Sequence, residues 1–187
     1  GDIVRIEERF HNAEDKVIFR RVYRYLPGTN PVTNQTQIPA RYLWNLKNPV
    51  LLKAVFLGLN KKNEAVLEYK SNFGIRYLEI RNKKLIINKV PVRIRGINYH
   101  ENLPRAMGKE HFQLIREDMQ TIRNMGINAI RFPHYAPPPY VVSMADSMGL
   151  LLFVELPIWR YPEPLFKNVH LLETAKTTIQ NMSRIYG

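Results

Sequence analysis

Three apolar segments in the second half of the chain end in polar side chains that could bind a ligand. The segments are V-R-I-R-G-I-N-Y-H-E (92–101), N-A-I-R-F-P-H-Y (128–135) and L-L-L-F-V-E (150–155). The polar side chains at or just beyond their ends are Asn98, His100, Glu101, Arg131, His134 and Glu155, and Trp159 follows soon after. Polar groups at the ends of buried parallel strands are typical of a ligand site at the carboxyl edge of a sheet. We therefore predict that these side chains meet in one pocket.

Each of these residues also has a structural explanation. A carboxylate at the end of 150–155 should be largely buried, and burying it is costly unless it is paired. Arg131 is the obvious partner, so Glu155 and Arg131 fit a structural ion pair as well as a ligand site. Trp159 and Tyr161 fit two roles equally, which are stacking on a sugar ring and covering the rim of the fold.

The segments that hold these side chains alternate between strands and helices. We predict strands over 92–98, 127–132 and 150–155, and helices over 109–125, 140–148 and Val169–Tyr186. Gly126 and Gly149 are the expected helix stops. In the last helix we expect an inward face made of Leu172, Ala175, Ile179 and Met182. The β-α order implies parallel strands joined by right-handed crossovers.

Two architectures have this order of elements. A doubly wound nucleotide-binding sheet carries a glycine-rich turn after its first strand. Here that place holds N-Y-H-E-N-L-P-R, without a G-x-G-x-x-G pattern. A (β/α)8 barrel instead gathers polar residues at the carboxyl ends of successive strands, which is the pattern seen. The sequence favours the first three to four βα units of a barrel.

The first half of the chain predicts strands separated by turns. We expect strands over 3–10, 17–26, 50–59 and Ala65–Phe73, followed by short strands at 77–81, 85–87 and 90–94. Strands at about ten-residue spacing predict a small antiparallel sandwich. Trp44 is expected to pack at its edge. The turn at Asn88 and Lys89 is unusual, because Gly fits such a two-residue turn more easily than Lys.

Composition excludes several classes of protein. The 187 residues are 45% hydrophobic, which is ample for a globular core. No segment approaches the ~18 consecutive apolar residues of a membrane span, and no cysteine is present for disulfides or thiolate metal sites. The formal charge of +12 is concentrated in residues 1–95, which hold 19 Lys and Arg against 8 Asp and Glu. It is spread singly along strands with no recognition-helix, zinc or RNP pattern, so we expect no nucleic-acid partner.

Several segments together resemble glycoside hydrolase family 2. G-I-R at 74–76 and L-I-I-N-K-V-P-V-R-I-R-G-I-N-Y-H-E at 85–101 resemble the junction where the immunoglobulin-like domain of that family meets the catalytic barrel. The resemblance continues through N-A-I-R-F-P-H-Y at 128–135, A-D-S-M-G-L-L-L-F-V-E at 145–155 and L-W-N-L-K-N-P-V-L-L at 43–52. It covers most of the chain from residue 42 onward.

The resemblance implies a retaining β-glycosidase that hydrolyses terminal β-linked sugars. The N-Y-H-E form at 98–101 is nearer to β-galactosidases and β-glucuronidases than to the mannosidase branch. The resemblance places His100 and His134 at the sugar, with Asn98, Glu101, Arg131 and Glu155 close by or supporting. It also places the acid/base and the nucleophile beyond residue 187, so no catalytic residue is expected in this chain and the chain alone is expected to be inactive.

The sequence also departs from that family. Many of its β-galactosidases have D-E-A-N-I-E-T-H after the third strand, and the later acidic residue and His of this run bind magnesium. This chain has V-E-L-P-I-W-R-Y at 154–161, which retains Glu155 but has Trp159 and Tyr161 at the ligand positions. We expect no magnesium site of that type and no cofactor.

The prediction as a whole is a fragment with two parts. An immunoglobulin-like β-sandwich over 1–78 is followed by the N-terminal part of a (β/α)8 barrel over 79–187, with 79–91 as a linking hairpin. The expected partners are a carbohydrate substrate and the remainder of a longer polypeptide, and a homo-oligomer is left open. A β-galactosidase-like activity is preferred, with a β-glucuronidase-type member or a non-catalytic carbohydrate-binding scaffold as alternatives. No signal peptide is visible, and the compartment stays open with a preference for the periplasm or secretion.

Overall fold

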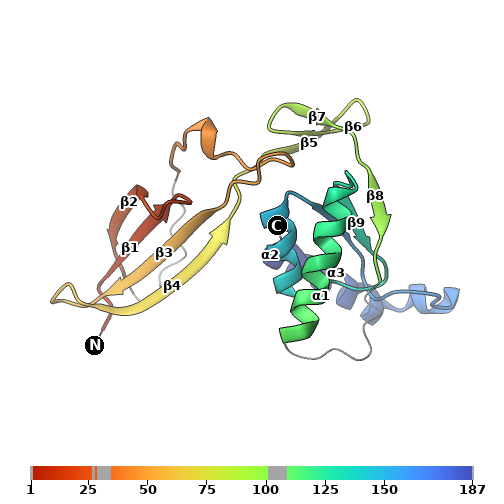
Figure 1. The fold of residues 1–187 in the computed structure, drawn as a ribbon. Coiled ribbons are helices and arrows are strands. Elements are labelled where there is room, and N and C mark those ends of the chain that lie inside the picture. The colour runs from red at the N-terminus through yellow and green to blue at the C-terminus, as the bar shows by residue number, and fades with distance from the viewer. Residues whose placement is uncertain (1, 27, 29–34, 101–108, 187) are drawn as a thin grey trace. The chain divides into compact units, whose positions relative to one another are not determined.

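The computed structural model describes residues 2–26, 28, 35–100 and 109–186, which fall into two compact units. Unit 1 comprises Gly1–Pro91 and unit 2 comprises Val92–Gly187. Figure 1 shows the strands of unit 1 and the mixed strands and helices of unit 2. Among the described residues, no helix is long and apolar enough to cross a membrane.

Unit 1 contains a four-stranded antiparallel sheet (Figure 1). Its strands are β1 (Arg5–His11), β2 (Val17–Arg24), β3 (Leu52–Leu59) and β4 (Ala65–Phe73), in the order β2-β1-β3-β4. All four agree with the predicted strands to within two residues at each end. Alternating Val, Ile, Phe and Tyr residues account for these strands, since such side chains pack well on a pleated surface.

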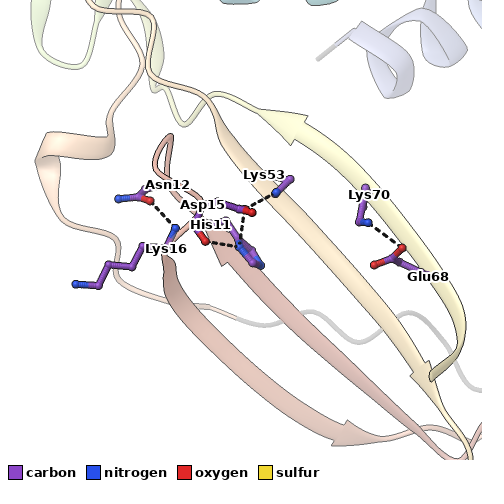
Figure 2. Close-up of polar contacts among 7 residues, drawn as sticks. All are labelled: His11, Asn12, Asp15, Lys16, Lys53, Glu68 and Lys70. Atoms are coloured by element: carbon purple, nitrogen blue, oxygen red, sulfur yellow. Dashed lines mark hydrogen bonds and ion pairs between the residues drawn. The ribbon is translucent and has the colours of Figure 1, made fainter. Parts of the chain in front are cut away.

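The turn between β1 and β2 is held by local polar contacts. Figure 2 shows Asn12 accepting a hydrogen bond from the backbone of Lys16, at 2.9 Å. Asp15 adopts a left-handed backbone with φ 61°, which Asp tolerates better than most residues. The ring of His11 lies 3.0 Å from the Asp15 carboxylate, which also pairs with Lys53 of β3. These contacts join the turn to the neighbouring strand.

Glu7 is a buried carboxylate in the middle of β1. It is 4% exposed, and its Oε1 accepts hydrogen bonds from Arg20 Nε at 2.5 Å and from Arg9 Nε at 2.6 Å. The guanidinium groups of Arg20 and Arg9 lower the pKa of Glu7 from 4.5 to about 2. This pairing explains how an acidic residue is accommodated in a strand that lies between two others.

The predicted sandwich needs a second layer that covers this sheet. Within the described residues, β4 is exposed along nearly its whole length, with Leu67 at 56% and Tyr69 at 60% exposure. The structure therefore establishes a β-rich unit with one four-stranded sheet. The immunoglobulin-like sandwich stays a prediction.

The next three strands form a second, smaller sheet, which belongs to unit 1 except for its last residue, Val92. It has the order β5-β6-β7 and contains β5 (Leu78–Arg81), β6 (Lys84–Ile87) and β7 (Val90–Val92). The turn after β6 has both residues in the left-handed region, Asn88 at φ 50° and Lys89 at φ 68°, as the two-residue turn requires. The segment expected to link two domains, 79–91, is grouped by its contacts with unit 1.

Trp44 is the largest buried side chain of unit 1, at 1% exposure. It follows a short 3₁₀ helix, Ala40–Tyr42. Its backbone N–H donates to Ile75 O at 2.8 Å, and its carbonyl accepts from Asn88 Nδ2 at the same distance. A Cβ at Gly74 would lie 2.8 Å from the indole, so this position requires glycine. The predicted packing role of Trp44 is confirmed.

Unit 2 is built on three parallel strands with β9 in the centre. They are β8 (Gly96–Asn98), β9 (Ala129–Phe132) and β10 (Leu151–Val154), in the order β10-β9-β8. Both pairings are parallel, with Gly96 and Leu151 opposite Ala129. Strands that follow one another in the sheet as they do in the sequence are what a barrel requires.

Two helices cover one face of this sheet. They are α1 (Lys109–Asn124) and α2 (Pro139–Met148), and with β9 they form a core that includes Ile115, Met119, Ile130, Phe132 and Val141. Pro139 lies at the first turn of α2, where a missing N–H costs nothing, and Gly149 ends the helix at φ 70°. Gly126, at φ 78°, follows α1 as predicted.

The third helix has the predicted bounds, but its apolar face differs from the prediction. A second 3₁₀ helix, Glu163–Lys167, precedes α3 (Val169–Tyr186). The expected inward face of α3 is wrong for Leu172 and Ile179, which are 44% and 54% exposed. Among the described residues, α3 packs mainly on this 3₁₀ helix and α2, so little covers its apolar side.

The amide of Asn128 joins the start of β9 to the segment before β8. Its Oδ1 accepts from the Arg95 N–H at 2.8 Å, and its Nδ2 donates to Arg93 O at 2.9 Å. Its own N–H donates to Arg95 O at 2.9 Å. Because Asn128 is 6% exposed, these bonds satisfy a buried amide and fix the register of the two strands.

We predict that Glu7→Gln lowers the free energy of unfolding by about 1–2 kcal/mol at neutral pH. Glu7 has a folded pKa of about 2 against an ordinary 4.5, so its contribution is complete above about pH 4.5 and lost as the pH falls toward 2. The exposure of Arg20 reduces the effect. Urea unfolding between pH 2 and 7 measures it, with the exposed Glu68→Gln as a matched control. A variant with the wild-type pH dependence would contradict the prediction.

We predict that Asn128→Ala lowers the free energy of unfolding by about 1–2 kcal/mol, because two backbone groups lose their partner. Asn128→Asp should lose at least as much, since its carboxylate still accepts from the Arg95 N–H but faces the Arg93 O with an acceptor and buries a charge. Thermal and urea unfolding measure both variants. Asn124→Ala, at an exposed position of α1, is the control, and equal losses in all three variants would rule out the proposed link.

Candidate active site

Backbone alternation places the polar strand ends of unit 2 on one face of its sheet. Ile130 and Phe132 are buried against the helices, so Arg131 between them extends from the opposite face. Asn98 is in register with Arg131 on the neighbouring strand, and Glu155 comes directly after β10. The parallel register therefore brings an amide, a guanidinium and a carboxylate together, as predicted.

Arg131 connects the ends of all three strands. Its Nε donates to Glu155 Oε1 at 2.6 Å, and Nη2 pairs with the same oxygen. Its Nη1 donates to Asn98 Oδ1 at 3.0 Å. A guanidinium suits this role because its donors are fixed in one plane and charge-assisted bonds are strong.

His134 is held over the same carboxylate by its backbone. Its N–H donates to Glu155 Oε2 at 3.0 Å, and its Nδ1 lies 3.4 Å from that oxygen. The residue has φ 72°, in the left-handed region that a non-glycine side chain seldom adopts. Such backbone conformations cluster at functional sites, where surrounding contacts over-determine them.

Glu155 is ionised but is less buried than predicted. The expectation of a largely buried carboxylate is wrong, because its side chain is 32% exposed at the end of an edge strand. The pKa of Glu155 lies below its ordinary value of 4.5, first because of the His134 N–H and then because of Arg131. The ion pair expected between Glu155 and Arg131 is present, at a position that solvent reaches.

The rings of His100 and Trp159 lie beside the imidazole of His134. The imidazoles of His100 and His134 have their centroids 6.5 Å apart. The indole of Trp159 stacks on the His134 ring at 5.0 Å with an interplanar angle of 30°. Trp159 is 54% exposed. One aromatic pair thus fixes the ring of His134 from the side while Glu155 fixes its backbone.

Two further residues near these strand ends are not among the predicted site residues. Arg160 lies with its guanidinium carbon 4.6 Å from the centre of the Trp159 ring. Tyr99 donates to Asp118 Oδ2 at 2.7 Å and packs edge-on against Phe132. The signal for Arg160 was only its position after Trp159, and a charged residue next to an aromatic one is common on surfaces.

Most of the predicted site residues lie in one cluster. Those that the structure brings together are Asn98, His100, Arg131, His134, Glu155 and Trp159. Glu101 lies outside the described residues. The binding of substrate by any of them stays a prediction, since the geometry shows convergence and not occupancy.

The cluster does not suit a divalent metal ion. Among the described residues, no group of three or more His, Asp or Glu side chains is placed to hold a metal ion. Trp159 and Tyr161 have no carboxylate or imidazole to offer, and Glu155 is already engaged by Arg131 and His134. Mg²⁺ prefers carboxylate and water ligands in octahedral geometry, so this donor set does not fit it.

The sequence of most of unit 2 matches a model of a known protein family. Residues 78–179 match the model described as glycosyl hydrolases family 2, TIM barrel domain. The match covers more than half of the chain. This chain belongs to glycosyl hydrolase family 2. The three parallel strands and their helices are accordingly part of the TIM barrel domain of that family.

Relatives in this family include bacterial β-galactosidases. The chain is 30% identical over 132 residues to a β-galactosidase of Thermoanaerobacter pseudethanolicus, which covers 70% of this chain and 18% of the relative. It is 31% identical over 128 residues to a β-galactosidase of Staphylococcus xylosus, covering 67% of this chain and 12% of the relative. The chain therefore spans less than a fifth of the length of these two proteins.

Solved structures of the family share the fold. A β-glucuronidase of Parabacteroides merdae matches with a TM-score of 0.71 and 22% identity, over 84% of this chain and 20% of that protein. A β-glucuronidase of Ruminococcus gnavus in complex with D-glucuronic acid matches with a TM-score of 0.65 and 21% identity, over 84% of this chain and 26% of that protein. At these identities the likeness shows the fold alone.

We predict that Glu155→Gln releases His134. Without the charge, the His134 N–H has a weaker acceptor and Arg131 loses its ion pair, so the His134 amide resonance should shift and exchange faster with solvent. The part of the acid titration of this resonance that disappears in Glu155→Gln should lie below about pH 4.5, because the pKa of Glu155 is depressed from 4.5. Amide NMR across an acid titration measures both effects.

The control for this prediction is Glu163→Gln, which removes an exposed ion pair with Lys167 and should leave the His134 amide unchanged. An amide of His134 that has the same shift and exchange rate in Glu155→Gln as in the wild type would contradict the inferred contact.

Proposed function

We propose that this chain is part of a retaining β-glycosidase of family 2 that hydrolyses terminal β-linked sugars, and that it is closest in activity to the β-galactosidases. The observation that carries the proposal is the cluster of Asn98, Arg131, His134 and Glu155 at the carboxyl ends of parallel strands, in a TIM barrel domain of this family. In such barrels the active site lies at that end.

The proposed architecture is the N-terminal part of a (β/α)8 barrel preceded by an immunoglobulin-like sandwich. Three parallel strands in sequential order, with helices on one face, support the barrel part over 79–187. The antiparallel sheet of unit 1 supports the sandwich part over 1–78. The partners we propose are a carbohydrate and the remainder of a longer polypeptide.

The cluster has the hydrogen-bonding groups that a sugar requires. If the proton of His134 is on Nδ1, facing Glu155, its Nε2 accepts a bond from a sugar hydroxyl. His100 and Asn98 add further donors and acceptors nearby. Bonds of this kind strengthen as the sugar ring gains oxocarbenium character, and this is how they accelerate hydrolysis.

The catalytic pair is proposed to lie outside residues 1–187. A retaining mechanism needs two carboxyl groups about 5–5.5 Å apart, one as nucleophile and one as acid/base. In the described part of the cluster, Glu155 is the one carboxylate, and both of its oxygens are occupied by Arg131 and His134. An engaged carboxylate with a lowered pKa is poorly suited to either catalytic role, so Glu155 orients its neighbours instead.

We predict that His134→Ala in the complete polypeptide lowers kcat/KM for a nitrophenyl β-galactoside by about 30- to 1000-fold, if the imidazole contacts the transition state. The melting temperature should change little, because the side chain is only partly buried. Steady-state kinetics and thermal unfolding on the same preparations measure both quantities.

A panel of β-galactoside, β-glucuronide and β-glucoside substrates tests the activity itself. His170→Ala on α3, at an exposed position, is the matched control and should behave as the wild type. Absence of turnover on the whole panel would refute the proposed function. A variant that melts earlier but keeps its activity per folded molecule would show that His134 is structural only.

A further inference from the structure

Arg160 is a cation held beside the candidate site without a carboxylate partner in the described part of the chain. Its guanidinium carbon lies 4.6 Å from the centre of the Trp159 ring. Its backbone is in the left-handed region, with φ 53°, so the loop directs this side chain in a conformation that a non-glycine residue seldom adopts. The same indole stacks on His134, which connects Arg160 to the cluster.

The charges of the cluster leave this cation in excess. Arg131 is neutralised by Glu155, which accepts two contacts from it. Arg160 has a ring contact and, among the described residues, no ion pair. Counted together with Arg160, the described residues of the cluster carry two guanidinium groups and one carboxylate, and Glu101 lies outside the described residues. A ligand with a negative group would restore the balance.

Stacking on an aromatic ring prepares a guanidinium to bind an anion. A guanidinium that lies with its flat face on a ring keeps the N–H donors at its edge available. Those donors match the two oxygens of a carboxylate in a bidentate arrangement. A lysine at this position would lack both the flat face and the fork of donors.

We propose that Arg160 is a specificity-determining residue that binds a carboxylate carried by the glycoside. This inference rests on the proposed function for the reaction, but it can fail independently of it. The carboxylate has two sources, which are a uronic acid in the sugar ring and an acidic group on the aglycone. In either case Arg160 contacts the ligand and Trp159 holds Arg160 in place.

The first experiment compares matched substrates with the complete polypeptide. A nitrophenyl β-galactoside is the neutral reference, a nitrophenyl β-glucuronide carries the charge on the sugar, and a carboxylated phenyl β-galactoside carries it on the aglycone. The ratio of kcat/KM for the preferred acidic substrate to that for the neutral one should fall roughly 10- to 100-fold in Arg160→Gln, because a charge-assisted pair is lost. Arg160→Lys should restore part of the ratio.

Controls separate this effect from general damage. Arg116→Gln removes an exposed guanidinium from α1 and should keep the wild-type ratio. Raising the salt concentration should lower the ratio in the wild type more than in Arg160→Gln, because an exposed charge pair is screened. An effect on the glucuronide alone identifies the sugar as the source, and an effect on the acidic aglycone alone identifies the leaving group.

The second experiment needs no turnover. Binding of D-glucuronate and D-galactose to the complete polypeptide is measured by calorimetry, with benzoate as a probe of the aglycone position. A preference for either acid that disappears in Arg160→Gln supports the inference, even if no glycoside is hydrolysed and the proposed function fails. An unchanged kcat/KM ratio together with no Arg160-dependent binding of either acid overturns it. Equal losses for neutral and acidic substrates also overturn it.

Discussion

The ion pair between Arg131 and Glu155 is the interaction on which the candidate site depends. Arg131 bonds to residues at the ends of the other two strands. Glu155, held by Arg131, in turn accepts a hydrogen bond from the backbone N–H of His134. Because solvent reaches both side chains, the pair contributes little to the stability of the fold, and its main effect is to orient its neighbours. At the opposite end of the sheet, Asn128 fixes the strand register that places these residues next to one another.

The balance of charge in the cluster supports the proposed binding of a sugar. Its carboxylate is engaged by a guanidinium and a backbone N–H, so little negative charge remains for a metal ion. What remains is a set of imidazole, amide and guanidinium groups, which suit the hydroxyls and acidic groups of a sugar. An indole under Arg160 and beside His134 orders two of these groups at once. Preorganised donors of this kind favour a developing charge in a reacting ligand.

Much of the fold was predictable because local pattern and tertiary structure agree. Alternating and continuous apolar runs marked the strands, and helical spacing with Gly126 and Gly149 marked α1 and α2. The parallel order followed from the β-α alternation, since strands joined by a helix return in the same direction. Convergence of the polar strand ends followed in turn. The predicted sandwich has no such support, because the pattern of β4 does not reveal what covers the faces of its sheet.

Sequence by itself therefore determined the elements, the parallel order and the residue types at the strand ends, because these depend on periodicity of 2 or 3.6 residues along the chain. Tertiary structure decided the rest. The solvent exposure of Glu155, the left-handed backbone of His134 and the stack of Trp159 on His134 depend on which segments meet in space. The exposed side of α3 has the same origin, since a helical pattern shows that one face is apolar but not which neighbour covers it.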